Sequence, residues 1–171
     1  MTLALNIALF QAGWLACVLA AAHGLPWAGI AAAIGVVAWH ALRAPRTAQE
    51  LKLVALAVAV GALCDSAFAA SGWISFAPAA AAEGLAPWWI LAMWALLATT
   101  LNVSLAWLRS RLPLAALLGA MSGPLAYWAG ARLGALELRQ PAAALGALAL
   151  VWAAILPGLL AAGRRLDGAA R

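Results

Sequence analysis

Residues 53–70 read LVALAVAVGALCDSAFAA, a stretch of eighteen residues in which Asp65 is the only charged side chain. A transmembrane helix needs about 20 predominantly apolar residues to cross roughly 30 Å of hydrocarbon. Ala, Leu and Val dominate the stretch, and it lacks the period-two alternation of a membrane β-strand. The stretch therefore predicts a transmembrane α-helix.

The composition of the whole chain extends this prediction. Of the 171 residues, 68% are hydrophobic and 9% are charged, whereas a soluble domain carries about 25% charged residues. So few charges could not cover a water-soluble fold, so lipid must solvate most of the exterior. We predict one all-α domain, a polytopic membrane helix bundle with about six spans: 3–22, 26–42, 53–70, 88–108, 113–131 and 142–162.

Basic residues are divided unequally between the two sides of this predicted bundle. Eight fall on the side of the N-terminus: Arg43, Arg46, Lys52, Arg109, Arg111, Arg164, Arg165 and Arg171. The opposite side holds two, Arg132 and Arg139. Because Lys and Arg are enriched in cytoplasmic loops, we expect both termini to face the cytoplasm. We attribute the net charge of +5 to these residues, which set the orientation of the chain in the membrane. Because the sequence has no stripe of basic residues that could bind a phosphate backbone, we expect no nucleic-acid partner.

The long connection between the third and fourth spans, residues 71–87, is apolar but too rich in Gly and Pro to span the membrane. It either lies along the outer leaflet or dips into the bundle and lines a cavity, and we favour the first interpretation. Weak similarities between the two halves could reflect an inverted duplication. Their spacings disagree, so we attribute them to chance.

Asp65 is the only acid inside a predicted span. A lone charge in hydrocarbon costs about 2.5–3.5 kcal/mol on insertion scales, so Asp65 must find a partner within the bundle. Tyr127 and Arg132 of the fifth span reach a similar depth, and the three side chains would form a polar cluster open to the outside. Asp65 either anchors the outer end of its helix or, with Tyr127 and Arg132, forms a catalytic, ion or proton site.

A second polar group lies toward the inner ends of the spans: Asn6, Gln11, His40, Thr99, Thr100, Asn102 and Ser104. Such side chains commonly form hydrogen bonds between membrane helices. The more specific hypothesis is a pocket for a lipid headgroup or a small molecule. Its candidate ligand-binding residues are Asn6, Gln11, His40, Thr99 and Asn102.

The sequence contains no motif that would indicate a metal site, a disulfide framework or a known type of catalytic centre. Cys17 and Cys64 stand alone, without the spacing of a zinc site or of a disulfide framework. The chain contains no nucleophile elbow, no P-loop and no HExxH motif. We therefore expect neither a metal nor a cofactor.

Four motifs, in the first, third, fourth and fifth spans, together resemble the DUF2878 family of small inner-membrane proteins of Gram-negative bacteria. They are Asn6-x4-Gln11-x2-Trp14, Gly61-x3-Asp65, Thr99-Thr100-Leu101-Asn102-x-Ser104-Leu105-x-Trp107-Leu108 and Ser122-Gly123-Pro124-Leu125-x-Tyr127-x2-Gly130-x-Arg132-Leu133-Gly134. A weaker likeness, through Gly61-Ala62-Leu63-Cys64-Asp65, is to lysoplasmalogenase-like membrane enzymes. Those enzymes are longer and carry more intramembrane acids.

The DUF2878 resemblance implies a multi-pass protein of the bacterial inner membrane and carries no catalytic residues with it. Because some genes of that family lie near genes for fatty-acid modification, the resemblance also implies a lipid-linked role. We expect an accessory or binding protein for membrane-lipid modification. The expected partners are membrane lipid and partner membrane enzymes, and an oligomer is compatible with this role. An intramembrane lipid-modifying enzyme using Asp65 and a small transporter are the alternatives.

Overall fold

The computed structural model describes residues 2–77 and 84–169. Within these ranges the chain forms six α-helices, a short 3-10 helix (η1) and two strands. The elements are α1 (Leu3–Ala22), α2 (Pro26–Arg43), α3 (Thr47–Ala70), β1 (Ile74–Phe76), α4 (Trp88–Leu101), η1 (Ala106–Ser110), α5 (Leu112–Arg132), β2 (Leu136–Leu138) and α6 (Pro141–Arg165).

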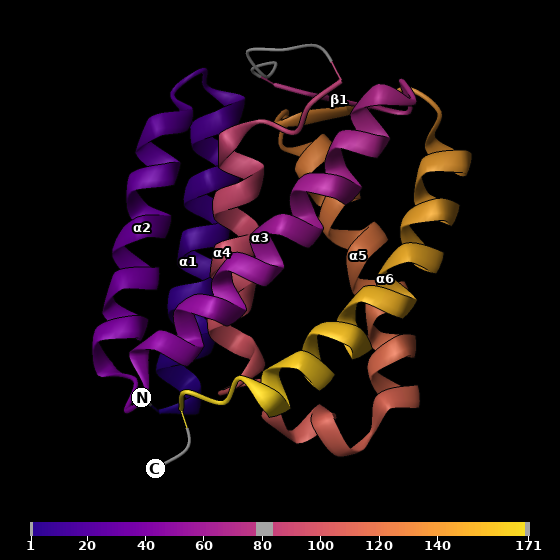
Figure 1. Cartoon of the computed structure of the whole chain (residues 1–171). Helices are drawn as coiled ribbons and strands as arrows, with labels where there is room; N and C mark the ends of the chain where they lie inside the picture. The colour runs from indigo at the N-terminus through magenta and orange to yellow at the C-terminus, as the bar shows by residue number, and fades with distance from the viewer. Residues whose placement is uncertain (1, 78–83, 170–171) are drawn as a thin grey trace.

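The helices run alternately up and down, and both ends of the chain lie at one end of the bundle, which we call the terminal end (Figure 1). The two strands lie at the opposite end, which we call the sheet end (Figure 1). α4 packs against α1, α2 and α3, while α5 packs chiefly against α6. The α5–α6 hairpin joins the other helices mainly through contacts of α6 with α3, α4 and η1.

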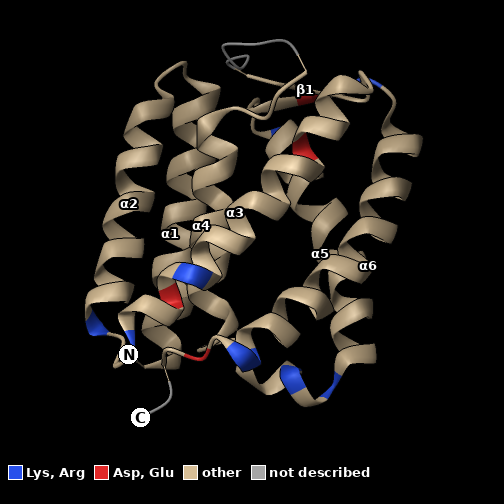
Figure 2. Ribbon diagram, in the orientation of Figure 1, with Lys and Arg blue, Asp and Glu red and all other residues tan. Residues whose placement is uncertain are grey.

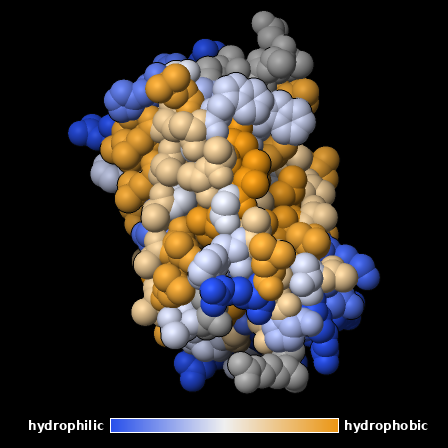
Figure 3. Space-filling view, turned by 90° about the vertical axis from the view of Figure 1, so that its left-hand side faces the viewer, coloured by the Kyte–Doolittle hydropathy of each residue, from blue (hydrophilic) through white to orange (hydrophobic). Residues whose placement is uncertain are grey.

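The outer surface is that of a membrane-embedded protein. Four helices, α1, α3, α5 and α6, are long and apolar enough to cross a membrane. Large apolar side chains face outward along them, among them Leu63 at 74% and Leu150 at 77% exposure. Most Lys and Arg residues of the described chain lie at the terminal end (Figure 2). Figure 3 shows an apolar band between two hydrophilic ends on the face formed by α1 and α2.

Two helices differ in extent from the spans predicted for them. α3 begins at Thr47 rather than at residue 53, because nothing after Pro45 breaks the helix and its first turns simply carry charged residues. The fourth span was predicted over 88–108, but α4 ends at Leu101 after only 14 residues. The chain then turns into η1.

The early end of α4 is stabilised by side chains. Thr99 and Thr100 direct their hydroxyls back to the carbonyls of Leu96 and Leu97. Asn6 of α1 donates from Nδ2 to the carbonyl of Thr99 at 3.0 Å, and its Oδ1 accepts from the backbone N–H of Ser104 at 3.2 Å. Asn6 thus satisfies backbone groups that a helix end would otherwise leave unpaired in an apolar setting.

The first part of the connection over 71–87 forms a strand, which the sequence analysis did not predict. Ile74 and Phe76 of β1 are buried, and β1 pairs antiparallel with β2 about the central pair of Ser75 and Glu137. The segment therefore closes the sheet end of the bundle as half of a two-stranded sheet. Residues 78–83 lie outside the described ranges.

The hairpins α3–α4 and α5–α6 share one local structure. α3 and α5 are each followed by a glycine with positive φ, Gly72 (72°) and Gly134 (86°). A three-residue strand comes next in each case, and the two strands pair symmetrically. Residues 61–76 and 123–138 therefore correspond position by position. This is a direct repeat, whereas the sequence analysis considered only an inverted one.

Candidate functional site

The repeat brings Asp65 and Tyr127 together, since they occupy equivalent positions on α3 and α5. Asp65 is completely buried. Its Oδ1 accepts a hydrogen bond from the Tyr127 hydroxyl, and its Oδ2 accepts one from Nε1 of Trp94 at 2.6 Å. A buried acid acting as acceptor for two neutral donors links three helices, α3, α4 and α5, in one contact.

Glycines one turn before these two residues make the contact possible. A Cβ on Gly61 would lie 2.2 Å from the ring of Trp94, and a Cβ on Gly123 would lie 2.3 Å from the ring of Trp152. The two indoles stack on each other at 4.9 Å between centroids, with 17° between their planes. α3 and α5 therefore enclose a tryptophan pair, and no larger residue fits at either glycine without displacing a ring.

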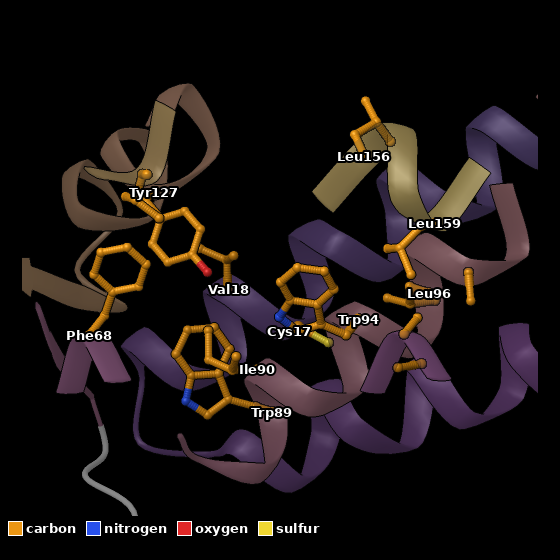
Figure 4. Close-up of a cluster of buried hydrophobic side chains, with 14 of the residues drawn as sticks. Cys17, Val18, Phe68, Trp89, Ile90, Trp94, Leu96, Tyr127, Leu156 and Leu159 are labelled. Carbon is orange, nitrogen blue, oxygen red and sulfur yellow. The ribbon is translucent and has the colours of Figure 1, made fainter. Parts of the chain in front are cut away.

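The Asp65 cluster is closed, although we expected it to open outward. Figure 4 shows Tyr127 entering the buried apolar cluster from α5, near Phe68 of α3 and Trp89 of α4. Arg132, the third residue of the predicted catalytic set, is exposed at the end of α5, and no hydrogen bond or ion pair joins it to Asp65 in the described structure. The structure thus unites Asp65 with Tyr127 and leaves Arg132 outside.

A second buried acid, Glu50, escaped the sequence analysis. It lies near the start of α3 with 1% exposure. Its Oε2 is hydrogen-bonded to Nε2 of His40 at 2.6 Å, and its Oε1 accepts from Nδ2 of Asn102 at 2.6 Å and from the backbone N–H of Gly168 at 3.0 Å. Helical periodicity could have identified it, because Glu50 shares the buried face of α3 with Ala57, Gly61 and Asp65.

The Glu50 network continues toward the surface through Asn102. Arg109 donates to Oδ1 of Asn102 and, at 2.6 Å, to Asp167. Asn102 also donates to the carbonyl of Leu166 at 3.1 Å, so the segment after α6 is bound to the rest of the terminal end. The exposure of 15% for Arg109 and 24% for Asp167 places this edge of the network near the surface.

Most of the predicted ligand-binding residues therefore use their polar groups in hydrogen bonds within the protein. Asn6, His40, Thr99 and Asn102 are buried and hydrogen-bonded to helix ends or to Glu50. Gln11 differs from these four, because it is exposed on α1 and faces a cavity. In the described ranges no three His, Cys, Asp or Glu side chains lie close enough to hold a metal ion.

The cavity has a volume of about 720 Å³ and lies between α1 and α4 on one side and α5 and α6 on the other. η1 contributes Trp107 and Leu108 to its lining. It opens sideways, since Ile7 of α1 and Met121 and Leu125 of α5 line it and are exposed. Exposed apolar side chains therefore flank this opening.

Trp152 separates the cavity from the Asp65 cluster. It lines the cavity and stacks on Trp94, which donates to Asp65 from the far side. Neither Asp65 nor Tyr127 is among the lining residues. The buried acid therefore stabilises the wall of the cavity and does not face its contents.

Comparison with known proteins identifies the family of the chain. The sequence model of a family described as protein of unknown function (DUF2878) matches residues 3–158, which includes all six helices except the last turns of α6. The chain belongs to the DUF2878 family. No curated protein and no solved structure matches it.

The motifs that carried the DUF2878 resemblance can now be given structural roles. Gly61-x3-Asp65 and Gly123-x3-Tyr127 form the two equivalent halves of the tryptophan enclosure. The Thr99–Leu108 motif forms the end of α4, the turn and the start of η1. Residues 159–169 of this DUF2878 protein, which hold the segment bound by Glu50, lie beyond the family match.

Proposed function

We propose that this DUF2878 protein is a multi-pass inner-membrane protein that binds a lipid acyl chain in the cavity between α1 and α5. The observation that carries the proposal is the cavity itself. Its volume of about 720 Å³ falls within the range of about 300–1,000 Å³ typical of small-molecule sites. Its lining is dominated by Leu, Ile, Phe, Met, Ala and Trp side chains, and the solvent at its mouth is lipid.

In the proposed topology all six helices cross the membrane and the terminal end faces the cytoplasm. The concentration of Lys and Arg at that end supports the orientation (Figure 2). α4, with 14 residues, is only about 20 Å long. It is surrounded by α1, α2 and α3, so it does not need the length of a helix that faces lipid over its whole course.

A binding role fits the site better than catalysis at Asp65. The enzyme hypothesis needs the acid to reach a substrate, yet Asp65 is enclosed behind Trp94 and Trp152. A protein that holds an acyl chain could serve lipid modification by presenting that chain to a partner membrane enzyme. We therefore propose the accessory role ahead of the enzyme and of the transporter.

The first test is photocrosslinking in detergent with a diacylglycerol that carries a diazirine on one acyl chain. We expect saturable labelling of the cavity residues Phe10, Leu97 and Leu118, mapped by mass spectrometry. Ala126→Phe should reduce this labelling at least fivefold, because Ala126 lines the cavity. The matched control is Ala154→Phe, on an exposed position of α6 that does not line the cavity.

Labelling spread evenly over outward-facing positions such as Leu63 and Leu150, and unchanged by Ala126→Phe, would refute binding in the cavity. A second test addresses the accessory role. In a deletion strain, the lipid profile should be restored by the wild type and by Ala154→Phe but not by Ala126→Phe. A lipid profile that deletion leaves unchanged would contradict that role.

A further inference from the structure

Gln11 is a polar side chain of α1 that has no hydrogen-bond partner within the described part of the chain. It is exposed on α1, eight residues after Leu3, which places it about 12 Å along the helix axis. No residue of the described chain forms a hydrogen bond with its side-chain amide, whereas Asn6, five residues earlier, donates through Nδ2 and accepts through Oδ1. A primary amide facing hydrocarbon is costly unless something supplies hydrogen bonds.

Ser122 of α5 lies across the cavity mouth at a similar depth. It is exposed, lines the cavity and stands ten residues after Leu112, about 15 Å along its helix. Ser104 adds a further polar side chain to the terminal-end part of the lining. Polar groups thus reach the cavity from both flanking helices near the middle of the membrane.

Charge is missing from this lining. The described residues that surround the cavity include no Asp, Glu, Lys, Arg or His, although the Glu50 network shows that the bundle can enclose such groups. A carboxylate or phosphate within the cavity would lose its hydration without gaining a cation. The cavity therefore discriminates against a charged group and accepts a neutral polar one.

We propose that the ligand of the cavity is an uncharged lipid whose hydroxyl or carbonyl oxygen lies at mid-membrane depth, hydrogen-bonded by Gln11 and within reach of Ser122. This inference rests on the proposed lipid-binding function and names its ligand class. The amide of Gln11 offers two donors and an acceptor, and the hydroxyl of Ser122 offers both roles. Diacylglycerols and long-chain quinones share the required chemistry, while phospholipid headgroups and ionised fatty acids do not.

The test is competition for the photocrosslinking site by four probes: a diacylglycerol, a long-chain isoprenoid benzoquinone, phosphatidylglycerol and an oxygen-free hydrocarbon of similar length. We expect one of the two neutral oxygenated probes to compete at least tenfold better than phosphatidylglycerol. Gln11→Leu should weaken that probe about 3–10-fold, the equivalent of one intramembrane hydrogen bond, and leave the hydrocarbon unchanged. The more affected oxygenated probe identifies the source of the ligand.

Gln11→Leu is a safe substitution for folding, because leucine is favoured in hydrocarbon. Gln140→Leu, at an exposed position before α6 and outside the cavity, controls for the loss of a glutamine. Equal competition by phosphatidylglycerol and the neutral probes, or an unchanged affinity in Gln11→Leu, would overturn this inference while leaving acyl-chain binding intact. Loss of saturable cavity labelling in the wild type would instead remove the proposed function.

Discussion

The two ends of α3 carry two buried acids with very different surroundings. Glu50 and Asp65 are separated by fifteen positions on one buried face, about 22 Å along the axis. Glu50 is bonded by an imidazole, an amide and a backbone N–H, and through Asn102 its network reaches Arg109. Asp65 is bonded by a phenol and an indole.

The difference between the partners of the two acids follows from the position of each acid along the bundle. Near the terminal end, ionic partners can remain partly hydrated, and Arg109 and Asp167 are both incompletely buried. The surroundings of Asp65 are apolar on every helix, and there neutral donors satisfy a carboxyl group without introducing a second charge. Glu50 thus organises a network that binds several chain segments at the terminal end, and Asp65 fixes one contact between two equivalent hairpins.

The largest effect should come from Glu50→Leu. The change removes the acceptor shared by His40, Asn102 and Gly168, so three buried donors lose their partner. We expect a loss of about 3–5 kcal/mol in the free energy of unfolding, measured by denaturant titration in detergent micelles. Lys52→Leu, an exposed charge two residues along the same helix, is the control and should change stability little.

Asp65→Leu should have a smaller effect, because two neutral donors are left unpaired and leucine suits the apolar site. We expect a loss of about 1–3 kcal/mol by the same titration. Asp65→Asn retains an acceptor for Tyr127 or Trp94 and should lie between this variant and the wild type. A loss for Asp65→Leu that exceeds that for Glu50→Leu would reverse the comparison of the two acids.

The features that could be predicted from the sequence are those that depend on composition or on the depth of a residue within a predicted span. The apolar helices followed from hydropathy, and Asp65 and Tyr127 were paired because they lie at similar depths. Glu50 was missed because a hydropathy window ends at the first charges, whereas the helix continues to Thr47. The helical periodicity of the buried positions on α3 would have identified Glu50, which the hydropathy window left out because of its charge.

Other features depend on contacts between distant segments. The end of α4 at Leu101 is stabilised by Asn6, which lies near the start of the sequence. The three-residue strands β1 and β2 are too short to show a period and exist only because they pair. The cavity, too, reflects how the α5–α6 hairpin is placed beside α1 and α4, which no local pattern encodes.

The third prediction concerns the tail that Glu50 binds. A Cβ on Gly168 would lie 2.6 Å from the carbonyl oxygen of Arg46 and 3.0 Å from the backbone nitrogen of Glu50. Gly168→Ala should therefore displace the tail at a cost of about 1 kcal/mol and speed its removal by carboxypeptidase. Gly158→Ala, where an added methyl group meets nothing within 4 Å, should leave digestion unchanged. Equal digestion of the two variants would show that the tail contributes little to the network.

The smallest effect is expected for Tyr127→Phe, which removes one donor from Asp65 and keeps the ring in place. Trp94 remains bonded to Asp65 at 2.6 Å, so the loss should be about 0.6 kcal/mol, the average for a hydrogen bond between membrane helices. The double variant with Asp65→Leu sharpens the test, because the hydroxyl has no acceptor once the acid is gone. Removing it from Asp65→Leu should then restore stability, whereas a further loss would mean that Tyr127 acts through a partner other than Asp65.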